Sequence, residues 1–190
     1  MALHHIAFHY MRHGQTDWNR DGICVGQKDQ PLNALGIRQA EVAAERVSSL
    51  GIDTIYHSPL SRAARTAEIV AAKTSIRLVP VPNLREACLG IKEGMFEHDP
   101  ADDFVTAWLR GYPIPKAETF TDFRDRVVDA ANCCLATGQA ESVLLIAHSA
   151  VFIALTSACG LKPQEIGHCH PYKFEPTPRG WKVGESSPRP

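Results

Sequence analysis

An arginine, a histidine and a glycine stand in a row directly after an apolar run near the start of the chain. Residues 5–11 predict a buried strand, and Arg12, His13 and Gly14 follow it. Arginine presents a planar fork of donors that suits phosphate oxygens, and a neutral imidazole can attack an electrophile or relay a proton. Glycine lets the backbone turn and approach a ligand closely. This triplet predicts a site that handles an anion.

Three further side chains with chemical capability follow other predicted strands. Arg62 lies in the first turn of the helix after strand 53–57, Glu86 follows strand 76–81, and His148 directly follows the apolar strand 142–147. In open α/β sheets, ligands bind outside the carboxyl ends of the strands. We therefore expect these side chains and His13 to converge on one crevice.

These arginine, histidine and glutamate side chains suit phosphoryl transfer, in which catalysis is mainly positioning and charge stabilisation. Arg12 and Arg62 can each bind two oxygens, and the start of the helix after His148 offers backbone N–H groups. One histidine can act as nucleophile, and a carboxylic acid must then protonate the leaving oxygen. Glu86 is the best-placed candidate for that acid. The alternatives for the same role are Glu93 and Glu97.

Strands alternate with helices along the chain, which predicts a mostly parallel sheet. The expected fold is a three-layer α/β/α sandwich with a mostly parallel central sheet and helices on both faces. Helices are expected over 33–50 with Asn33 as cap, from Ser58-Pro59 with serine as cap, around 101–110, over 119–137 and over 150–158. Residues 172–175 and 181–183 are expected to form two edge strands.

The chain of 190 residues, with 44% hydrophobic content, suits a single domain over 1–190. Residues 91–117 are irregular and are expected to form a lid-like insertion, and about 185–190 a frayed tail. The insertion carries four aromatic and five acidic side chains, which favour a small phosphoester without heavy charge. They are Phe96, Phe104, Trp108 and Tyr112, and Glu93, Glu97, Asp99, Asp102 and Asp103.

Composition argues against several classes of partner. A net charge of −1 gives no general attraction to nucleic acid or an anionic membrane, and no run approaches the length of a membrane span. Without a visible secretion signal or a Cys-x-x-Cys pair, the six cysteines predict reduced thiols in a cytoplasmic protein. The His168-x-His170 spacing favours a loop pair without function over a metal site. The C-terminal edge strands are a candidate homodimer surface.

Several segments together resemble a known family. Residues 12–19 (Arg-His-Gly-Gln-Thr-Asp-Trp-Asn) resemble the signature of the histidine phosphatase superfamily, which has the phosphoglycerate-mutase-like fold. Segments 26–40, 58–67, 84–94 and 147–148 resemble its further motifs in the family's order, so the resemblance covers about residues 6–183.

The resemblance implies a role for each matching residue. His13 would be the phosphorylated nucleophile, and Glu86 the proton donor. The phosphoryl oxygens would be held by Arg12, Arg62 and His148. Asn19 would touch the phosphoryl group or the substrate, and Gly26 and Ser149 would also bind the substrate. The resemblance implies no metal and no cofactor, and its substrate would be a small-molecule phosphoester.

The chain departs from the family pattern at positions that bear on the reaction. Ser149 stands where glycine often follows the second histidine, and Lys92 stands where an aromatic residue is common. Phosphoglycerate mutases carry an arginine pair in the segment after the acid, whereas Arg110 is the single arginine of 91–117. Without a basic set for a substrate carboxylate, we expect hydrolysis by the phosphatase branch. The alternatives are phosphoglycerate-mutase-type transfer and a non-catalytic phospholigand-binding module.

Overall fold

A mixed sheet organises the computed structural model, which describes residues 2–72, 76–97, 103–137 and 142–187. Its strand order is β3-β2-β4-β1-β5-β6. The strands are β1 (Phe8–Arg12), β2 (Thr54–His57), β3 (Arg77–Pro80), β4 (Val143–Ala147), β5 (Pro171–Thr177) and β6 (Gly180–Glu185). The first four strands run parallel, and β5 and β6 continue the sheet antiparallel beyond β1. The predicted α/β class with a mostly parallel sheet is confirmed.

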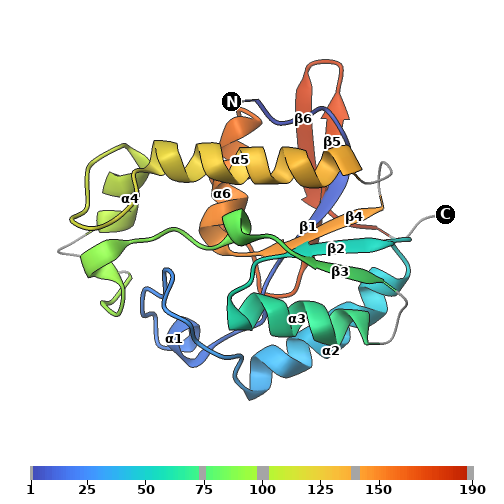
Figure 1. The fold of residues 1–190 in the computed structure, drawn as a ribbon, viewed down its shortest axis with the longest axis horizontal. Helices are drawn as coiled ribbons and strands as arrows, with labels where there is room; N and C mark the ends of the chain where they lie inside the picture. The colour runs from blue at the N-terminus through green and yellow to red at the C-terminus, as the bar shows by residue number, and fades with distance from the viewer. Residues whose placement is uncertain (1, 73–75, 98–102, 138–141, 188–190) are drawn as a thin grey trace.

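Helices cover both faces of this sheet (Figure 1). On one face lie α2 (Ala34–Ser48) and α3 (Ser61–Ala71), and on the other lie α5 (Phe120–Thr137) and α6 (Ser149–Ala158). The shorter helices are α1 (Asp17–Arg20), α4 (Phe104–Leu109) and the 3₁₀ turns η1 (Pro82–Leu84) and η2 (Gly90–Lys92).

Side-chain alternation along the central strands creates two hydrophobic cores. Tyr10 of β1 and Leu145 of β4 enter the core under α5 and α6, while Met11 and Ile146 enter the core under α2 and α3. All five residues of β4 are buried, which explains its unbroken apolar sequence. Two covered faces give the ends of β1 and β4 a rigid support.

One of the two predicted helix caps is confirmed and the other needs correction. The Asn33 side chain accepts from Gly36 N and caps α2 as predicted. Ser58 does not cap α3, because that helix begins at Ser61 after Leu60. The cap comes instead from the Asp29 carboxylate, which accepts from Ser61 N at 2.8 Å. A side chain distant in sequence has therefore replaced the expected local cap.

The C-terminal strands are longer than expected, and only one of them is an edge. β5 pairs with both β1 and β6, so the described edges of the sheet are β3 and β6. Ser186 also hydrogen bonds to Pro171 O at 2.9 Å. Of the tail expected to fray, 188–190 lie outside the described residues, as do 101–102 of the expected helix around 101–110.

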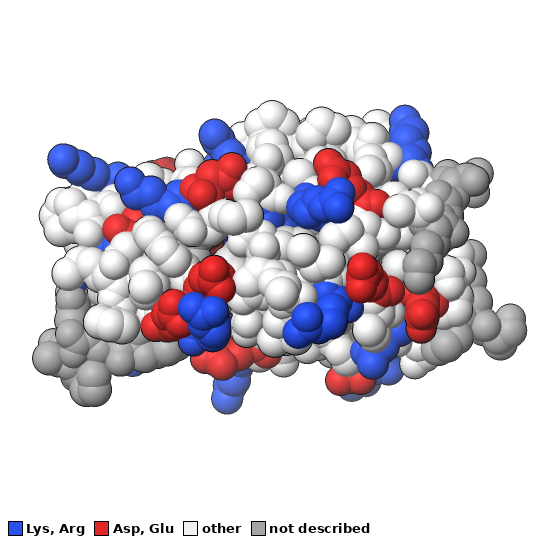
Figure 2. Space-filling model, turned by 90° about the horizontal axis from the view of Figure 1, so that it is seen from below, with Lys and Arg blue, Asp and Glu red and all other residues white. Residues whose placement is uncertain are grey.

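Charges of both signs are interspersed on the face that α2 and α3 cover (Figure 2). The exposed ion pairs include Arg20 with Asp17 and Arg65 with Glu68. All six cysteines carry free thiols. Within the described parts of the chain, no helix is both long and apolar enough to cross a membrane.

Candidate active site

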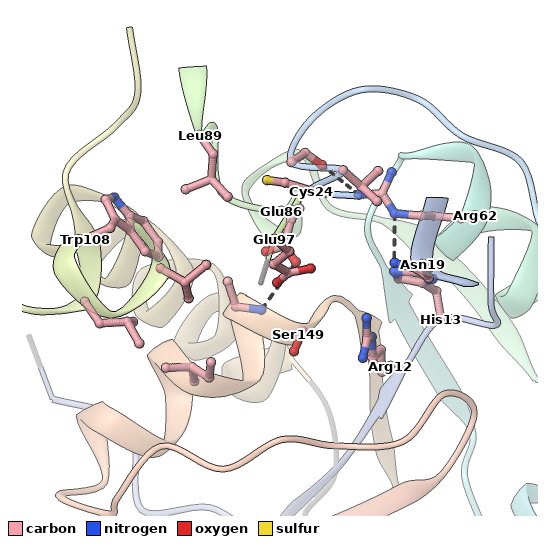
Figure 3. A pocket seen from close by; sticks show the side chains of 16 residues that line it. Arg12, His13, Asn19, Cys24, Arg62, Glu86, Leu89, Glu97, Trp108 and Ser149 are labelled. Atoms are coloured by element: carbon pink, nitrogen blue, oxygen red, sulfur yellow. Dashed lines mark hydrogen bonds between the residues drawn. The ribbon is translucent and has the colours of Figure 1, made fainter. Parts of the chain in front are cut away.

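A pocket lies where β1 and the segments after β2, β3 and β4 meet (Figure 3). Because these strands are parallel, their carboxyl ends all lie at the same end of the sheet. The pocket brings together seven of the eight predicted site residues: Arg12, His13, Asn19, Gly26, Arg62, Glu86 and Ser149. The eighth, His148, is fully buried beside them.

The His13 ring is held in one orientation and stays neutral. Its Nδ1 lies 2.7 Å from Gly14 O, which can only accept, so Nδ1 carries the hydrogen and Nε2 the lone pair. Arg62 Nε donates to that Nε2 at 3.2 Å. Burial, reinforced by the nearby Arg62 and His148, holds the pKa of His13 well below its usual 6.5. A neutral imidazole with its Nε2 lone pair near a guanidinium suits nucleophilic attack on a bound phosphoryl group.

The backbone after His13 is fixed by contacts from two helices. Gly14 N donates to Thr66 Oγ1 of α3 at 3.0 Å, and Thr66 in turn donates to Arg62 O. A Cβ on Gly14 would stand 2.5 Å from Gly36 O of α2, so only glycine fits this approach. Thr66, whose part in positioning Gly14 was not predicted, thus ties the loop to α3.

Arg62 is buried in the first turn of α3, with 1% of its surface exposed. Besides its bond to His13, it donates from Nη1 to Lys28 O at 3.0 Å and from Nη2 to Gly26 O at 2.8 Å. Gly26 has a φ of +51°, and a Cβ there would meet the Glu93 carboxylate. Gly26 therefore contributes its carbonyl to the site, and the loop orients the guanidinium.

Arg12, the last residue of β1, is the second guanidinium in the pocket. Its Nη1 donates to Ile166 O at 3.2 Å. Its buried Nε has no hydrogen-bond partner among the described residues. A buried donor without a partner is costly, and an anionic ligand would satisfy it.

His148 lies behind the pocket and pairs with Ser58. The His148 and His13 ring centroids are 5.1 Å apart, and His148 Nε2 lies 2.7 Å from Ser58 Oγ. Burial and the charges of Arg62 and Arg12 hold the pKa of His148 well below its usual value. Its Nδ1 is buried without a partner among the described residues. With Ser58 donating to Nε2, Nδ1 would carry the hydrogen and could donate to an oxyanion.

Glu86 lies between the apolar residues Leu89 and Trp108 and the pair formed by His13 and Arg62 in the view of Figure 3. Its carboxylate accepts from Ala87 N at 2.9 Å and from Ala150 N, in the first turn of α6, at 3.3 Å. Burial raises the pKa of Glu86 despite the opposing effect of these bonds and of the two arginines. A carboxyl group with a raised pKa suits proton donation to a leaving group.

The two competing carboxylates have different positions. Glu93 accepts from Gln27 N at 3.0 Å and Leu89 N at 3.1 Å, so it joins two loops. Glu97 lines the pocket near Glu86. Glu97 therefore stays a geometric alternative, whereas Glu93 is engaged in holding the backbone.

The remaining wall of the pocket is apolar. It is formed by Leu89, Val105, Trp108, Leu109 and Ile153, together with Cys24, Val25 and Ala150. Of the four aromatic residues expected to form a wall, Trp108 lines the pocket and Phe104 is buried, whereas Phe96 and Tyr112 are exposed. The Lys92 ammonium group lies over the Phe104 ring, 5.2 Å from its centroid. Arg110 is exposed.

Two residues have contacts that sequence reasoning did not anticipate. His168 Nδ1 lies 2.8 Å from His13 O, and the two rings are 5.5 Å apart. Burial lowers the pKa of His168 to about 4. Asn19 lines the pocket, but its Oδ1 accepts from Thr16 N in a capping box at the start of α1. Among the described residues, no three or more His, Cys, Asp or Glu side chains are grouped to hold a metal ion.

Comparison with known proteins agrees with this architecture. Residues 8–185 match the histidine phosphatase superfamily (branch 1), and the chain belongs to that family. It is 37% identical over 164 residues to the probable phosphoglycerate mutase GpmB of Proteus mirabilis (strain HI4320), covering 82% of this chain and 76% of the relative.

Solved structures give the same overall likeness. A mycobacterial glucosyl-3-phosphoglycerate phosphatase in complex with VO3 has a TM-score of 0.81 and 25% identity, covering 95% of this chain and 98% of the other. TTHB049 from Thermus thermophilus has a TM-score of 0.75 and 31% identity, covering 96% of this chain and 100% of the other. The similar proteins thus include ones named as a mutase and ones named as a phosphatase.

Proposed function

We propose that the protein is a phosphatase that hydrolyses a small phosphomonoester through a phosphohistidine formed on His13. The observation that carries the proposal is one pocket with a neutral imidazole, two guanidinium groups and the half-buried carboxyl of Glu86, whose pKa is raised. These are the parts that a two-step phosphoryl transfer to water requires.

In the first step, His13 Nε2 attacks phosphorus and the bond from phosphorus to the leaving oxygen breaks. Glu86, protonated at the start, gives its proton to that oxygen, so the product leaves as a neutral alcohol. Arg62 Nε, which donates to His13 Nε2, would transfer its hydrogen bond to a phosphoryl oxygen as the N–P bond forms. Arg12 and His148 would donate to the other oxygens.

In the second step, water attacks the phosphohistidine. The Glu86 carboxylate takes a proton from the water, the N–P bond breaks, and inorganic phosphate is released. His13 regains its lone pair, and Glu86 is again protonated. One carboxyl group thus acts as acid and then as base.

The wall facing the leaving group supports an uncharged or weakly charged alcohol. Besides Arg12 and Arg62, no arginine or lysine lines the pocket among the described residues, and Glu97 adds a carboxylate there. Side chains such as Leu89, Trp108 and Ile153 would pack against carbon rather than against a second anionic group.

Phosphoglycerate-mutase-type transfer is the second candidate, because curated relatives such as GpmB of Proteus mirabilis carry that name. A mutase must retain a substrate that bears a carboxylate as well as phosphate. The acidic and apolar wall offers no described cation for that carboxylate, which favours hydrolysis.

The test measures phosphate release and acid-labile histidine phosphorylation with a panel of phosphomonoesters. We expect wild type to show both, and His13→Ala to lose both, with turnover reduced by at least about 10³-fold. Full activity of His13→Ala would refute the nucleophile assignment. Rapid isomerisation of 3-phosphoglycerate with a bisphosphorylated primer, without phosphate loss, would favour the mutase. Vanadate binding without turnover of any ester would favour a phospholigand-binding module.

A further inference from the structure

Arg126 of α5 binds the backbone of the segment that carries Glu86. Its Nη1 donates to Asn83 O at 2.9 Å and to Arg85 O at 3.0 Å, and its Nη2 donates to Glu86 O at 3.0 Å. Three carbonyls of the segment before and at Glu86 thus converge on one guanidinium. Figure 1 shows η1, where this segment starts, against α5.

Glu118 holds the same guanidinium from the other side. It accepts from Arg126 Nε at 2.9 Å and from Nη2 at 2.6 Å, a two-pronged ion pair with both side chains about one-fifth exposed. The Arg126 guanidinium also stacks over the Phe123 ring, 4.7 Å from its centroid. Its direction is therefore fixed by packing as well as by charge.

The pair also contacts the chain on the other side of Glu86. Glu118 Oε1 accepts from Cys88 N at 2.7 Å, and Glu118 N donates to Cys88 O at 3.1 Å. Glu118 O accepts from the indole of Trp108 at 2.8 Å. Arg126 and Glu118 thus bind the backbone at residues 83, 85, 86 and 88, and Glu118 also holds Trp108 of the apolar wall.

From these contacts we infer that Arg126 and Glu118 are positioning residues that aim the Glu86 carboxyl at the leaving oxygen. Neither lines the pocket, so their effect on the reaction is indirect. The inference rests on the proposed function, because it needs Glu86 to protonate the leaving group. A general acid works only within hydrogen-bond distance of its target. A small shift of the backbone of residues 83–88 would move the Glu86 carboxyl out of that distance.

A positioning role predicts an effect that depends on the leaving group. An alkoxide is a poor leaving group and needs the proton, whereas 2,4-dinitrophenolate leaves readily without one. Loss of Arg126 should therefore slow alkyl phosphates far more than 2,4-dinitrophenyl phosphate. Damage to the phosphoryl pocket itself would slow both substrates together.

The experiment compares kcat/KM for glycerol phosphate and 2,4-dinitrophenyl phosphate in Arg126→Met, Arg126→Lys, Glu118→Gln and Glu86→Gln. We expect Arg126→Met to lose about tenfold or more on the alkyl ester, part of the 10²–10⁴-fold that a general acid supplies, and less than about twofold on the activated ester. Glu86→Gln should show the same selectivity more strongly. Arg126→Lys should recover part of the alkyl activity.

Arg124→Met is the matched control, because Arg124 lies on the same helix and binds Asp125 rather than the 83–88 segment. It should leave both rates unchanged. Equal losses on the two esters, or no loss on the alkyl ester, in folded Arg126→Met would overturn the inference. If Arg126→Met does not fold, the loss of kcat/KM on the alkyl ester relative to the activated ester in Glu118→Gln tests the inference instead. Failure of the proposed function is distinct, since wild type would then form no phosphohistidine with either ester.

Discussion

At the scale of single residues, Arg62 links the fold to the chemistry. Burying a guanidinium is costly unless its donors find acceptors. Arg62 meets this condition with Gly26 O, Lys28 O and the His13 ring. The bonds to the two carbonyls orient the guanidinium so that its Nε donates to His13 Nε2, the atom proposed to attack phosphorus. We therefore expect both stability and activity to depend on this side chain.

Arg62→Lys should separate charge from geometry. Lysine keeps the positive charge but lacks the planar fork, so at least one buried carbonyl loses its donor. We expect kcat/KM to fall by about 10²–10³-fold and the free energy of unfolding by about 1–3 kcal/mol. Steady-state kinetics and urea unfolding measure the two effects.

The control for that variant is Arg65→Lys, one turn further along α3. Arg65 is 60% exposed and pairs with Glu68. Its replacement should change the free energy of unfolding by less than about 0.5 kcal/mol and leave turnover unchanged. Wild-type turnover of Arg62→Lys would contradict the proposed role of the fork.

At the scale of elements, the start of α2 is packed against the loop that follows His13. A Cβ on Gly36 would stand 2.1 Å from Gln15 O, which is backbone and cannot move alone. Gln39 of the same helix accepts from Gln15 N at 2.9 Å. The position of α2 is thus coupled to that of the loop after His13 by these two contacts.

Gly36→Ala tests this contact. Within a helix, glycine to alanine normally stabilises by up to about 1 kcal/mol. Here we expect the opposite sign, a loss of about 1–3 kcal/mol from overpacking, together with slower turnover as the loop shifts. Gly184→Ala in β6, where a Cβ would meet nothing within 4 Å, is the control. A more stable, fully active Gly36→Ala would disprove the coupling.

At the scale of the whole molecule, three neutral histidines near the carboxyl ends of the parallel strands are expected to make folding sensitive to acid; His13 and His148 are buried and His168 is half-buried. The pKa values of His13, His148 and His168 all lie below the unfolded value, chiefly because burial penalises the charged ring. Below about pH 6.5 the unfolded chain therefore binds protons that the folded chain does not. Glu86, with its raised pKa, acts in the opposite direction and is a single group.

We expect the free energy of unfolding to be highest near neutral pH and to fall as the pH drops from about 6.5 toward 4. Urea unfolding at about pH 7.5, 6, 5 and 4 measures this slope. His168→Asn keeps an amide donor for His13 O and should flatten the slope between 6.5 and 4, since the pKa of His168 is about 4. Stability that is constant or higher at about pH 5 than at neutral pH would contradict this account.

The ends of strands and the Asn33 helix cap could be predicted from the sequence because both depend on local patterns. His13 and His148 directly follow apolar runs, and Asn33 caps its own helix, so short stretches were enough to place them. The parallel sheet then required the strand ends to share an edge. The family signature in residues 12–19 and the later motifs added the expected role of each residue.

Only the tertiary structure decided which partners hold these residues. His168 reaches His13 across 155 positions, Ser58 reaches His148 across 90, and Arg126 reaches the Glu86 segment across about 40. Such contacts depend on how the sheet twists and how α5 and α3 pack on it. A local pattern reports periodicity and caps, which arise within one or two turns. Long-range partners depend on packing of the whole chain, so they leave no mark in a local pattern.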